Sequence, residues 1–505
     1  MNVFQRKMKQ PALHRHAAVF AGACLSLLAS AAAQAVTVRG FEGTSLLDNV
    51  TLGNAFRPPD TMGAVGTTQF LESTNGSYTV YDKFTGAVQQ RLSFTNFWAN
   101  AGQSGAPNGD QRILFDQFTK RWITLGFGAS VSDIQIGISD TSNAMGTWKS
   151  TKISAFPGGT ADYPTLGMDA KGVYIGTNNF QSGFKGTSLF VIPKADLFGG
   201  APTTANMSTF VNPYPAVLDR GFAIQGAVNW GSNPTNTGKI LALNVDTGLD
   251  FNFYKVNGVN AAGATQTASS SVGVAAYDFT APARQPDGSR KVDTLDERLS
   301  SNVYESNGKL YAVHTVTPTG TDHTAVRWMV LDANTGAVIE EGDIGGGGFD
   351  YYQGSIAVNE YGEAVIGFNR SGGADKGIDG RISFMAQAFG TDSGGGLDVT
   401  SGQFLLKRSG IDDYHCGIRV NPAACRERWG DYSSVTIDPN NHHAFYAIGE
   451  YSSQWAVLPG FTTTERAIWN TYIAEINTIP EPSTYALFAL GLVSLVVVGR
   501  KAKRD

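Results

Sequence analysis

Residues 109–127 read GDQRILFDQFTKRWITLGF and contain the pattern from which the fold is predicted. Asp110 precedes a short apolar run, residues 113–115, residues 117–120 have the composition of a turn, and a second run begins at residues 121–123. Short apolar runs joined by polar turns are typical of β-strands in hairpins. The stretch therefore predicts one strand–turn–strand unit that opens with an acidic residue.

The same arrangement recurs along the chain. Six further stretches contain it in more or less complete form: 58–88 (PPDTMGAVGTTQFLESTNGSYTVYDKFTGAV), 161–180 (ADYPTLGMDAKGVYIGTNNF), 221–250 with GKILALNVDTG, 297–342, 351–371 and 427–476. Repeats of short strands, with 60 glycines to supply turns, favour four-stranded blades around an axis. We therefore predict an all-β fold for residues 36–478, a β-propeller of seven blades. Two packed β-sandwiches are the alternative.

Two further features agree with a propeller. The units resemble those of secreted seven-bladed propellers, in which blades open with a small acid and an Arg-Trp strand recurs. Residues 139–150, SDTSNAMGTWKS, resemble a degenerate Asp-box of sialidase-type propellers, which implies that Asp140 and Trp148 organise a surface hairpin. Ring closure predicts that the strand at 466–476 pairs with the N-terminal segment 36–50, because closure protects edge strands.

The N-terminus carries an export signal. Arg6, Lys7, Lys9 and Arg15 precede an apolar stretch at 17–32 and a small-x-small site, Ala33-Gln34-Ala35, so residues 1–35 are predicted to be a cleaved signal peptide. Its removal takes away Cys24 and leaves only Cys416 and Cys425. An even pair in an exported protein predicts a disulfide.

The C-terminus, residues 479–505, combines a Pro480-Glu481-Pro482 turn, an apolar run at 485–498 and a basic cluster that includes Arg500 and Lys501. We predict a transmembrane helix over about 484–499 with its basic end in the cytoplasm. The stretch resembles the PEP-CTERM sorting signal of Gram-negative envelope proteins. The resemblance implies an exosortase as partner, an inner-membrane intermediate held by this helix, and delivery to the cell surface or extracellular matrix.

Charge limits the partners of the exported part. The whole chain carries −5, and removing the positive signal peptide and tail leaves −11 for residues 36–478. This balance argues against nucleic acid as a partner. It is compatible with divalent cations, and equally with simple solubility.

Four acids recur just before the first strand of their units: Asp60, Asp110, Asp162 and Asp431. In a propeller the first strands line the central channel, so these carboxylates are candidates to share a cation such as Ca²⁺, which prefers oxygen ligands. The alternative is that each caps a turn through backbone amides. Arg112, Arg220, Arg298 and Arg428 lie near the same positions, as an ionic ring or as a site for a carboxylated sugar.

The sequence names no catalytic residue. The histidines lack HExxH spacing, and there is no GxSxG elbow or phosphate loop. Paired carboxylates for glycoside hydrolysis could be assembled from Asp296, Glu297, Asp350 and Asp431. Trp98 and Trp455, both in loop-like contexts, are the candidates to stack on a sugar ring.

Together these patterns predict an exported component of the cell envelope or extracellular polysaccharide matrix with a non-catalytic binding or structural role. The alternative is a propeller glycoside hydrolase or lyase that acts on extracellular polysaccharide. Fold alone does not separate them, because propellers host both kinds of function.

Overall fold

Short antiparallel strands make up nearly all the regular structure of the computed structural model. It describes residues 36–103, 109–215, 220–288, 290–391, 395–412 and 427–478, which belong to one unit, Val36–Thr478. The predicted signal peptide, disulfide pair, sorting turn and transmembrane helix lie outside these residues. Within the described part of the chain, no helix has the length and apolar character to cross a membrane.

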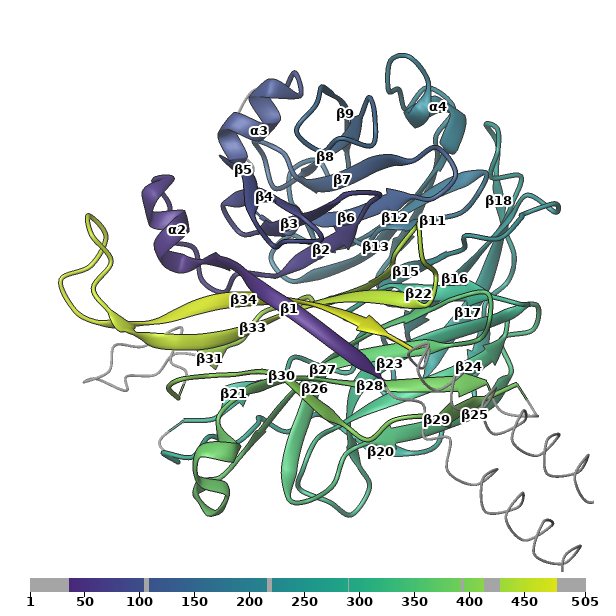
Figure 1. Ribbon diagram of the computed structural model, residues 1–505. Helices are drawn as coiled ribbons and strands as arrows, with labels where there is room; N and C mark the ends of the chain where they lie inside the picture. The colour runs from purple at the N-terminus through teal and green to yellow at the C-terminus, as the bar shows by residue number, and fades with distance from the viewer. Residues whose placement is uncertain are drawn as a thin grey trace, which may run out of the picture. The chain divides into compact units, whose positions relative to one another are not determined.

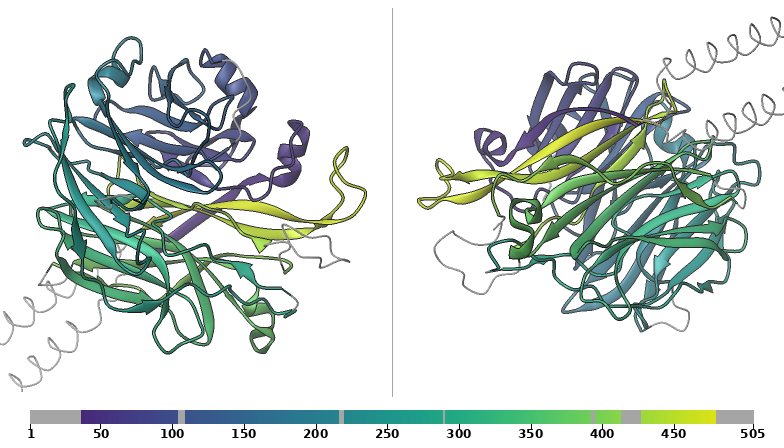
Figure 2. Two further views of the ribbon diagram at one scale, coloured as in Figure 1. Left: turned by 180° about the vertical axis from the view of Figure 1, so that it is seen from behind. Right: turned by 60° about the horizontal axis from the view of Figure 1, so that its bottom comes forward.

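The sheets are arranged around a common axis, as a β-propeller requires (Figures 1 and 2). The first strands of the units contact one another in series: β32 (Ser434–Ile437) with β2 (Met62–Val65), β2 with β6 (Arg112–Asp116), β15 (Phe222–Val228) with β22 (Val303–Ser306), and β22 with β26 (Phe349–Val358). These strands are almost wholly buried. The predicted propeller fold is therefore confirmed.

Five blades are separate sheets of four or five strands. Three come from the first part of the chain. The first contains β2, β3 (Gln69–Thr74), β4 (Ser77–Asp82) and β5 (Val88–Ser93), and the second contains β6, β7 (Arg121–Phe127), β8 (Asp133–Ser139) and β9 (Trp148–Ser154). The third contains β10 (Thr160–Asp162), β11 (Gly167–Met168), β12 (Gly172–Phe180), β13 (Phe184–Pro193) and β14 (Ser208–Pro213). Two come from the last part of the chain. One contains β26, β27 (Ala364–Gly372), β28 (Ser383–Thr391), β29 (Leu397–Val399) and β30 (Phe404–Arg408). The other contains β32, β33 (Ala444–Ala456) and β34 (Arg466–Asn477), and the N-terminal strand β1 (Thr37–Ser45) completes it.

The predicted count of seven blades is wrong, because the strands of the fourth and fifth units do not form separate sheets. They form one ten-stranded sheet: β15, β16 (Thr237–Leu243), β17 (Phe251–Asn257), β18 (Thr265–Gln266), β19 (Ser270–Val272), β20 (Tyr277–Asp278), β22, β23 (Lys309–Pro318), β24 (Ala325–Asp332) and β25 (Val338–Ile344). A parallel pairing joins the two halves, Ala227 opposite Val303 and Val228 opposite Tyr304. Backbone hydrogen bonds between two first strands thus merge what the repeat pattern treats as two blades.

The remaining elements are short. A two-stranded sheet joins β21 (Val292–Asp293) to β31 (Glu427–Arg428). The helices are α2 (Leu46–Thr51), α3 (Phe94–Asn100), α4 (Lys194–Phe198) and the 3₁₀ segment η1 (Ala374–Gly380). Ser45 caps α2 in a capping box with Asp48, which satisfies backbone donors at the helix start.

One turn recurs between neighbouring strands and explains part of the repeat. In residues 82–86, DKFTG, the Asp82 carboxylate accepts hydrogen bonds from the amides of Phe84 (3.0 Å) and Thr85 (2.9 Å), and Gly86 takes a φ of +73°. Residues 332–336, DANTG, repeat it, with the Asp332 carboxylate bound by two amides and Gly336 at +75°. A short acid that binds the turn amides, followed by a glycine that tolerates positive φ, fixes a tight reversal.

The ring closes through its two ends. β1 pairs antiparallel with β34, from Thr37 opposite Asn477 to Ser45 opposite Asn470, as the sequence predicts. Beside this seam the fully buried Glu72 carboxylate accepts hydrogen bonds from the Thr44 amide (3.0 Å), the Thr44 hydroxyl (2.7 Å) and the Tyr81 hydroxyl (2.5 Å), and from Thr471 on β34. One carboxylate therefore joins strands from both ends of the chain to the first blade.

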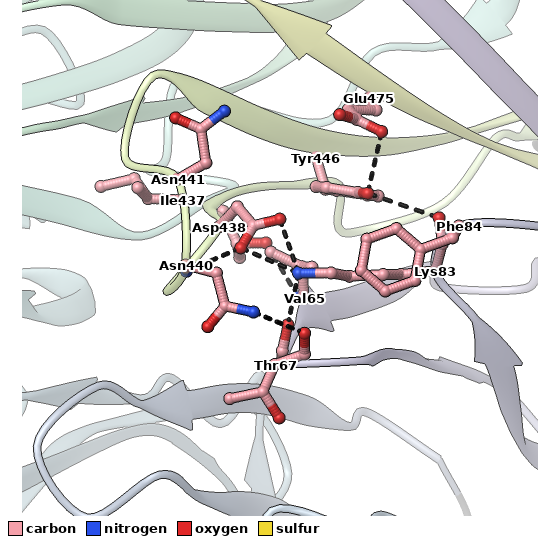
Figure 3. A network of polar contacts seen from close by, with 12 residues as sticks. Val65, Thr67, Lys83, Phe84, Ile437, Asp438, Asn440, Asn441, Tyr446 and Glu475 are labelled. Carbon is pink, nitrogen blue, oxygen red and sulfur yellow. Dashed lines mark hydrogen bonds and ion pairs between the residues drawn. The ribbon is translucent and has the colours of Figure 1, made fainter.

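A buried ion pair lies at the same closure, between the first and last blades (Figure 3). The Lys83 ammonium follows β4 and donates to both oxygens of Asp438, at 2.7 and 2.9 Å, and to the Gly66 carbonyl at 3.1 Å. The two side chains are 1% and 7% exposed. A second pair of the same kind, Lys194 with Asp116 at 2.6 Å, joins the second and third units.

We predict that Lys83→Met destabilises the propeller, since it leaves the Asp438 carboxylate buried without its cation. Loss of one partner of a buried pair costs about 3–5 kcal/mol. Urea unfolding of residues 36–478 measures the change. The control is Lys149→Met, which breaks an exposed pair with Asp140 (3.2 Å) and should cost less than about 1 kcal/mol. Equal effects of the two variants would contradict the role assigned to Lys83.

Candidate functional site

Several blades begin with a residue in the left-handed backbone region. Asp60, Asp110, Tyr163, Ala223 and Gln353 have φ values of 46°, 57°, 52°, 50° and 50°. Residues other than glycine rarely adopt this conformation, and it persists only where surrounding contacts hold it. At Asp60, Asp110 and Tyr163 it precedes the first strand. The backbone there is shaped to place particular side chains at one end of the channel.

The four predicted acids Asp60, Asp110, Asp162 and Asp431 gather at this end, which we call the acidic mouth. The Asp60 carboxylate accepts a hydrogen bond from the Asp431 amide at 2.9 Å and another from the Asn75 amide group at 2.6 Å. Asp60 is 3% exposed, so both of its oxygens are used inside the protein. It joins the seventh unit to the first.

Asp110 is held in the same way by the third and seventh units. Its Oδ2 accepts hydrogen bonds from the Tyr163 amide (3.2 Å) and the Tyr432 hydroxyl (3.1 Å). The buried Arg112 guanidinium lies over the Tyr432 ring, 3.7 Å from its centroid, and donates through Nε to the Pro164 carbonyl at 2.9 Å. Arg112 Nη2 is buried without a hydrogen-bond partner among the described residues.

Two arginines neutralise part of the acidic mouth. Arg298 binds both carboxylate oxygens of Asp296 at 2.6 Å, and its guanidinium lies over the Tyr163 ring at 4.5 Å. Arg428 pairs with Asp431. The fourth candidate, Arg220, lies elsewhere: it donates to the Thr267 carbonyl at 2.7 Å and packs on Tyr254. The bidentate geometry suited to a sugar carboxylate is already taken by a protein carboxylate at Arg298.

Burial and mutual repulsion raise the pKa values of three carboxyl groups in the acidic mouth. Burial, and then the charge of Asp431, raises the pKa of Asp60 to about 7, although Arg428 acts in the opposite direction. Burial and the neighbouring carboxylates of Asp60, Asp162 and Asp431 hold the pKa of Asp110 well above its usual range. Burial and Asp431 also raise the pKa of Asp162. Like charges this close are not all ionised at neutral pH.

The described residues contain no group of three or more His, Cys, Asp and Glu side chains placed to hold a metal ion. At Asp60 and Asp110 the carboxylate oxygens accept hydrogen bonds from amides and a hydroxyl, and most of these donors belong to other units rather than to the acid's own turn.

The other carboxylates considered for glycoside hydrolysis are bound by protein groups. Glu297 is 4% exposed and accepts from the Thr280 amide at 2.6 Å. Asp350 is 1% exposed and accepts from the Arg284 amide at 2.8 Å and from His323 at 3.1 Å. Asp296 is bound by Arg298. Only Asp431 belongs to the acidic mouth, so these four acids do not form one pair of free catalytic carboxylates.

The loop contexts predicted for the two ligand-binding tryptophans are wrong. Trp98 belongs to α3 and is 0% exposed, packed edge-on against Phe97 (5.4 Å) in an aromatic cluster. It is a core residue and has no face for a ligand. Trp455 lies in β33 and is half-buried. The Asp-box interpretation is consistent with the structure, because Trp148 is buried and its indole donates to the Ala144 carbonyl at 2.8 Å within a hairpin.

Sequence reasoning missed the residues that support the acids: Asn75, Tyr163 and Tyr432. A signal was present, because Tyr163 directly follows Asp162 and Tyr432 directly follows Asp431. The repeated Asp-Tyr pair places a ring over Arg112 from two units. Asn75 had no such signal, since its role depends on a turn that closes back on Pro58 and Asp60.

Comparison with known proteins identifies the C-terminus. Residues 478–504 match the PEP-CTERM protein-sorting motif. The motif indicates an exported protein that an exosortase sorts to the cell envelope. A search of curated proteins gives no match for the chain.

Among solved structures, similarity is limited to the general fold. A protein of unknown function from Dyadobacter fermentans is 10% identical, with a TM-score of 0.40 over 87% of this chain and 99% of that one. A GH43 endo-arabinanase from Bacillus licheniformis is 10% identical, with a TM-score of 0.30 over 59% and 99%. The WD40 domain of SCAP from fission yeast is 9% identical, with a TM-score of 0.35 over 94% and 90%. Similarity this distant carries no argument about activity.

The raised pKa of Asp60 predicts a specific pH dependence of stability. The unfolded chain has an Asp pKa of about 3.9, so between about pH 4 and pH 7 the folded state binds the extra proton and stability falls as pH rises. In Asp60→Asn the difference in unfolding free energy between pH 4.5 and pH 7 should shrink by about 1 kcal/mol or more. Urea unfolding at both pH values measures it.

The matched control is Asp82→Asn. Hydrogen bonds from Thr85 lower the pKa of the exposed Asp82, and asparagine supports the same turn. This variant should leave the difference between pH 4.5 and pH 7 unchanged. An unaltered pH profile in Asp60→Asn would show that Asp60 is ionised in the folded protein at both pH values.

Proposed function

We propose that this protein is an exosortase-sorted component of the cell surface or extracellular polysaccharide matrix, whose propeller has a non-catalytic binding or structural role. The C-terminal sorting motif supports the destination. The observation that carries the non-catalytic role is the pairing at the acidic mouth. The Asp60 and Asp110 carboxylates and the two guanidinium groups bind other protein groups, which supports a role in holding units together.

One observation favours the alternative, a propeller glycoside hydrolase or lyase. A carboxyl group with a pKa of about 7 beside a second carboxylate is what a general acid needs. Asp60, however, is enclosed and uses both oxygens in hydrogen bonds to Asp431 and Asn75. An enzyme would need the mouth to open and expose Asp60, and loss of activity in Asp60→Asn without loss of folding would support that alternative.

Sorting is tested by replacing Pro480, Glu481 and Pro482 with alanine in the full chain. We expect the variant to accumulate in the membrane fraction as a longer species, because the exosortase no longer recognises it. Intact mass and cell fractionation measure the outcome. Lys501→Arg keeps the basic end and should be processed as the wild-type protein is. Identical masses and distributions of the alanine variant and the wild-type protein would overturn the sorting proposal.

Calcium binding at the acidic mouth is a separate question that the same four acids raise. Calorimetric titration of residues 36–478 with Ca²⁺ tests it. A shared cation predicts saturable binding that Asp110→Asn combined with Asp162→Asn removes, whereas turn capping predicts no binding. We expect the second outcome, because amides and hydroxyls already bind the carboxylates of Asp60 and Asp110. Saturable binding that the double variant abolishes would contradict it.

A further inference from the structure

A pocket opens at the other ends of the first strands. Its cavity volume is about 280 Å³. The strands that begin at the acidic mouth end here: Gln117 follows β6, Asn229 and Trp230 follow β15, and Asn359 follows β26. Glu305 of β22 and His442, after β32, complete the wall. Five units therefore contribute to one concave site, which we call the tryptophan pocket.

A much smaller cavity adjoins the pocket. It measures about 10 Å³ and is lined by Ala64, Val65, Leu114, Phe115, Tyr304, Thr436 and Ile437 together with Gln117 and Trp230. A cavity of that size holds at most one water molecule. Gln117 and Trp230 line both cavities, so the wall of the tryptophan pocket is backed by mostly apolar side chains of the first strands.

Trp230 supplies an aromatic surface in this pocket. It is half-buried, follows β15 after Asn229, and packs against Phe118 with ring centroids 6.2 Å apart. The indole is thus held by a neighbouring ring and also lines the cavity. A large ring fixed in this way is suited to contact with an apolar ligand face.

The rest of the wall is polar and mostly uncharged. Asn229 accepts from the Gly231 amide at 2.7 Å, and its amide nitrogen has no hydrogen-bond partner among the described residues. Glu360 accepts a hydrogen bond from His442 Nδ1 at 2.6 Å, and Asn307 donates to the Glu360 carbonyl at 2.8 Å. Glu305 is paired with Lys239 at 2.9 Å. The cavity therefore offers amide donors and acceptors, together with one carboxylate paired with a lysine and a second, Glu360, that accepts a hydrogen bond from a histidine.

We propose that the tryptophan pocket binds one unit of a neutral polysaccharide, with the sugar ring stacked on Trp230 and its hydroxyls bound by Asn229, Gln117 and Glu360. This inference rests on the proposed binding role at the cell surface. A sugar ring has an apolar C–H face and hydroxyls that both donate and accept, which matches one aromatic plane surrounded by amides and carboxylates. A volume just below that of typical ligand pockets suits one sugar unit rather than a longer segment.

Charge favours a neutral polysaccharide over an acidic one as the ligand of the tryptophan pocket. Glu305 and Glu360 lie in the wall, and the exported part of the chain carries −11, so an acidic polysaccharide is disfavoured. Lys239, the cation beside Glu305, is already bound by that carboxylate. A neutral chain brings no charge to be desolvated.

The test is calorimetry on residues 36–478 with cellohexaose, xylohexaose and mannohexaose, and with hexagalacturonate as the acidic counterpart. We expect binding of at least one neutral hexasaccharide and none of hexagalacturonate. Trp230→Ala should weaken that binding about tenfold or more, the loss expected for a stacked ring. Phe279→Ala is the control, an exposed aromatic residue outside the pocket, and should bind as the wild-type protein does.

Asn229→Asp provides a second variant of unchanged size. It keeps the oxygen that accepts from Gly231 but replaces the free amide nitrogen, so it should weaken binding even if Trp230→Ala fails to fold. Saccharide binding that survives both changes would overturn this pocket and leave the surface-binding function intact. No binding of any neutral hexasaccharide by the folded wild-type protein, or a preference for hexagalacturonate, would overturn the ligand class. Neither result depends on processing of the sorting motif.

Discussion

The pairing of β1 with β34 is the constraint on which the rest of the structure depends, because a propeller whose ring is open exposes two sheet edges and its axial core. Polar groups buried at the seam make this pairing specific. Glu72 binds Thr44 of β1 and Thr471 of β34, and Lys83 binds Asp438 across the junction of the first and last blades. Misregistration of β34 would take the Thr471 hydroxyl away from the buried Glu72 carboxylate, and a buried acceptor that loses a hydrogen bond destabilises the fold.

Closure also explains why the two ends of the ring differ. At the ends where first strands begin, left-handed residues turn Asp60 and Asp110 inward, and the neighbouring units bind them. The charged side chains at these ends hold neighbouring units together. At the ends where first strands finish, Asn229 and Trp230 border an open cavity whose polar groups are only partly used. Recognition and cohesion are thereby placed at opposite ends of the same strands.

The sequence predicted features that depend on local pattern. Repeated strand–turn–strand units implied a propeller, and acids placed before first strands proved to meet at one end of the channel. Features that depend on tertiary contacts escaped it. Trp98 stands in a stretch rich in turn-forming residues, yet it lies in the helix α3 and is buried. The parallel pairing of Val228 with Tyr304 joins two units into one sheet, and no pattern in the sequence indicates it. The tryptophan pocket was missed because it draws single residues from many units.

The seam has a consequence for the order of events during export. Arg39 and Glu475, which bind each other across it, are 436 positions apart in the sequence. If the chain crosses the membrane from its N-terminus, β1 emerges first and must wait for β34, which is among the last segments to appear. Contacts between distant segments form slowly. On that route the ring can close only after β34, which ends directly before the sorting motif, has emerged.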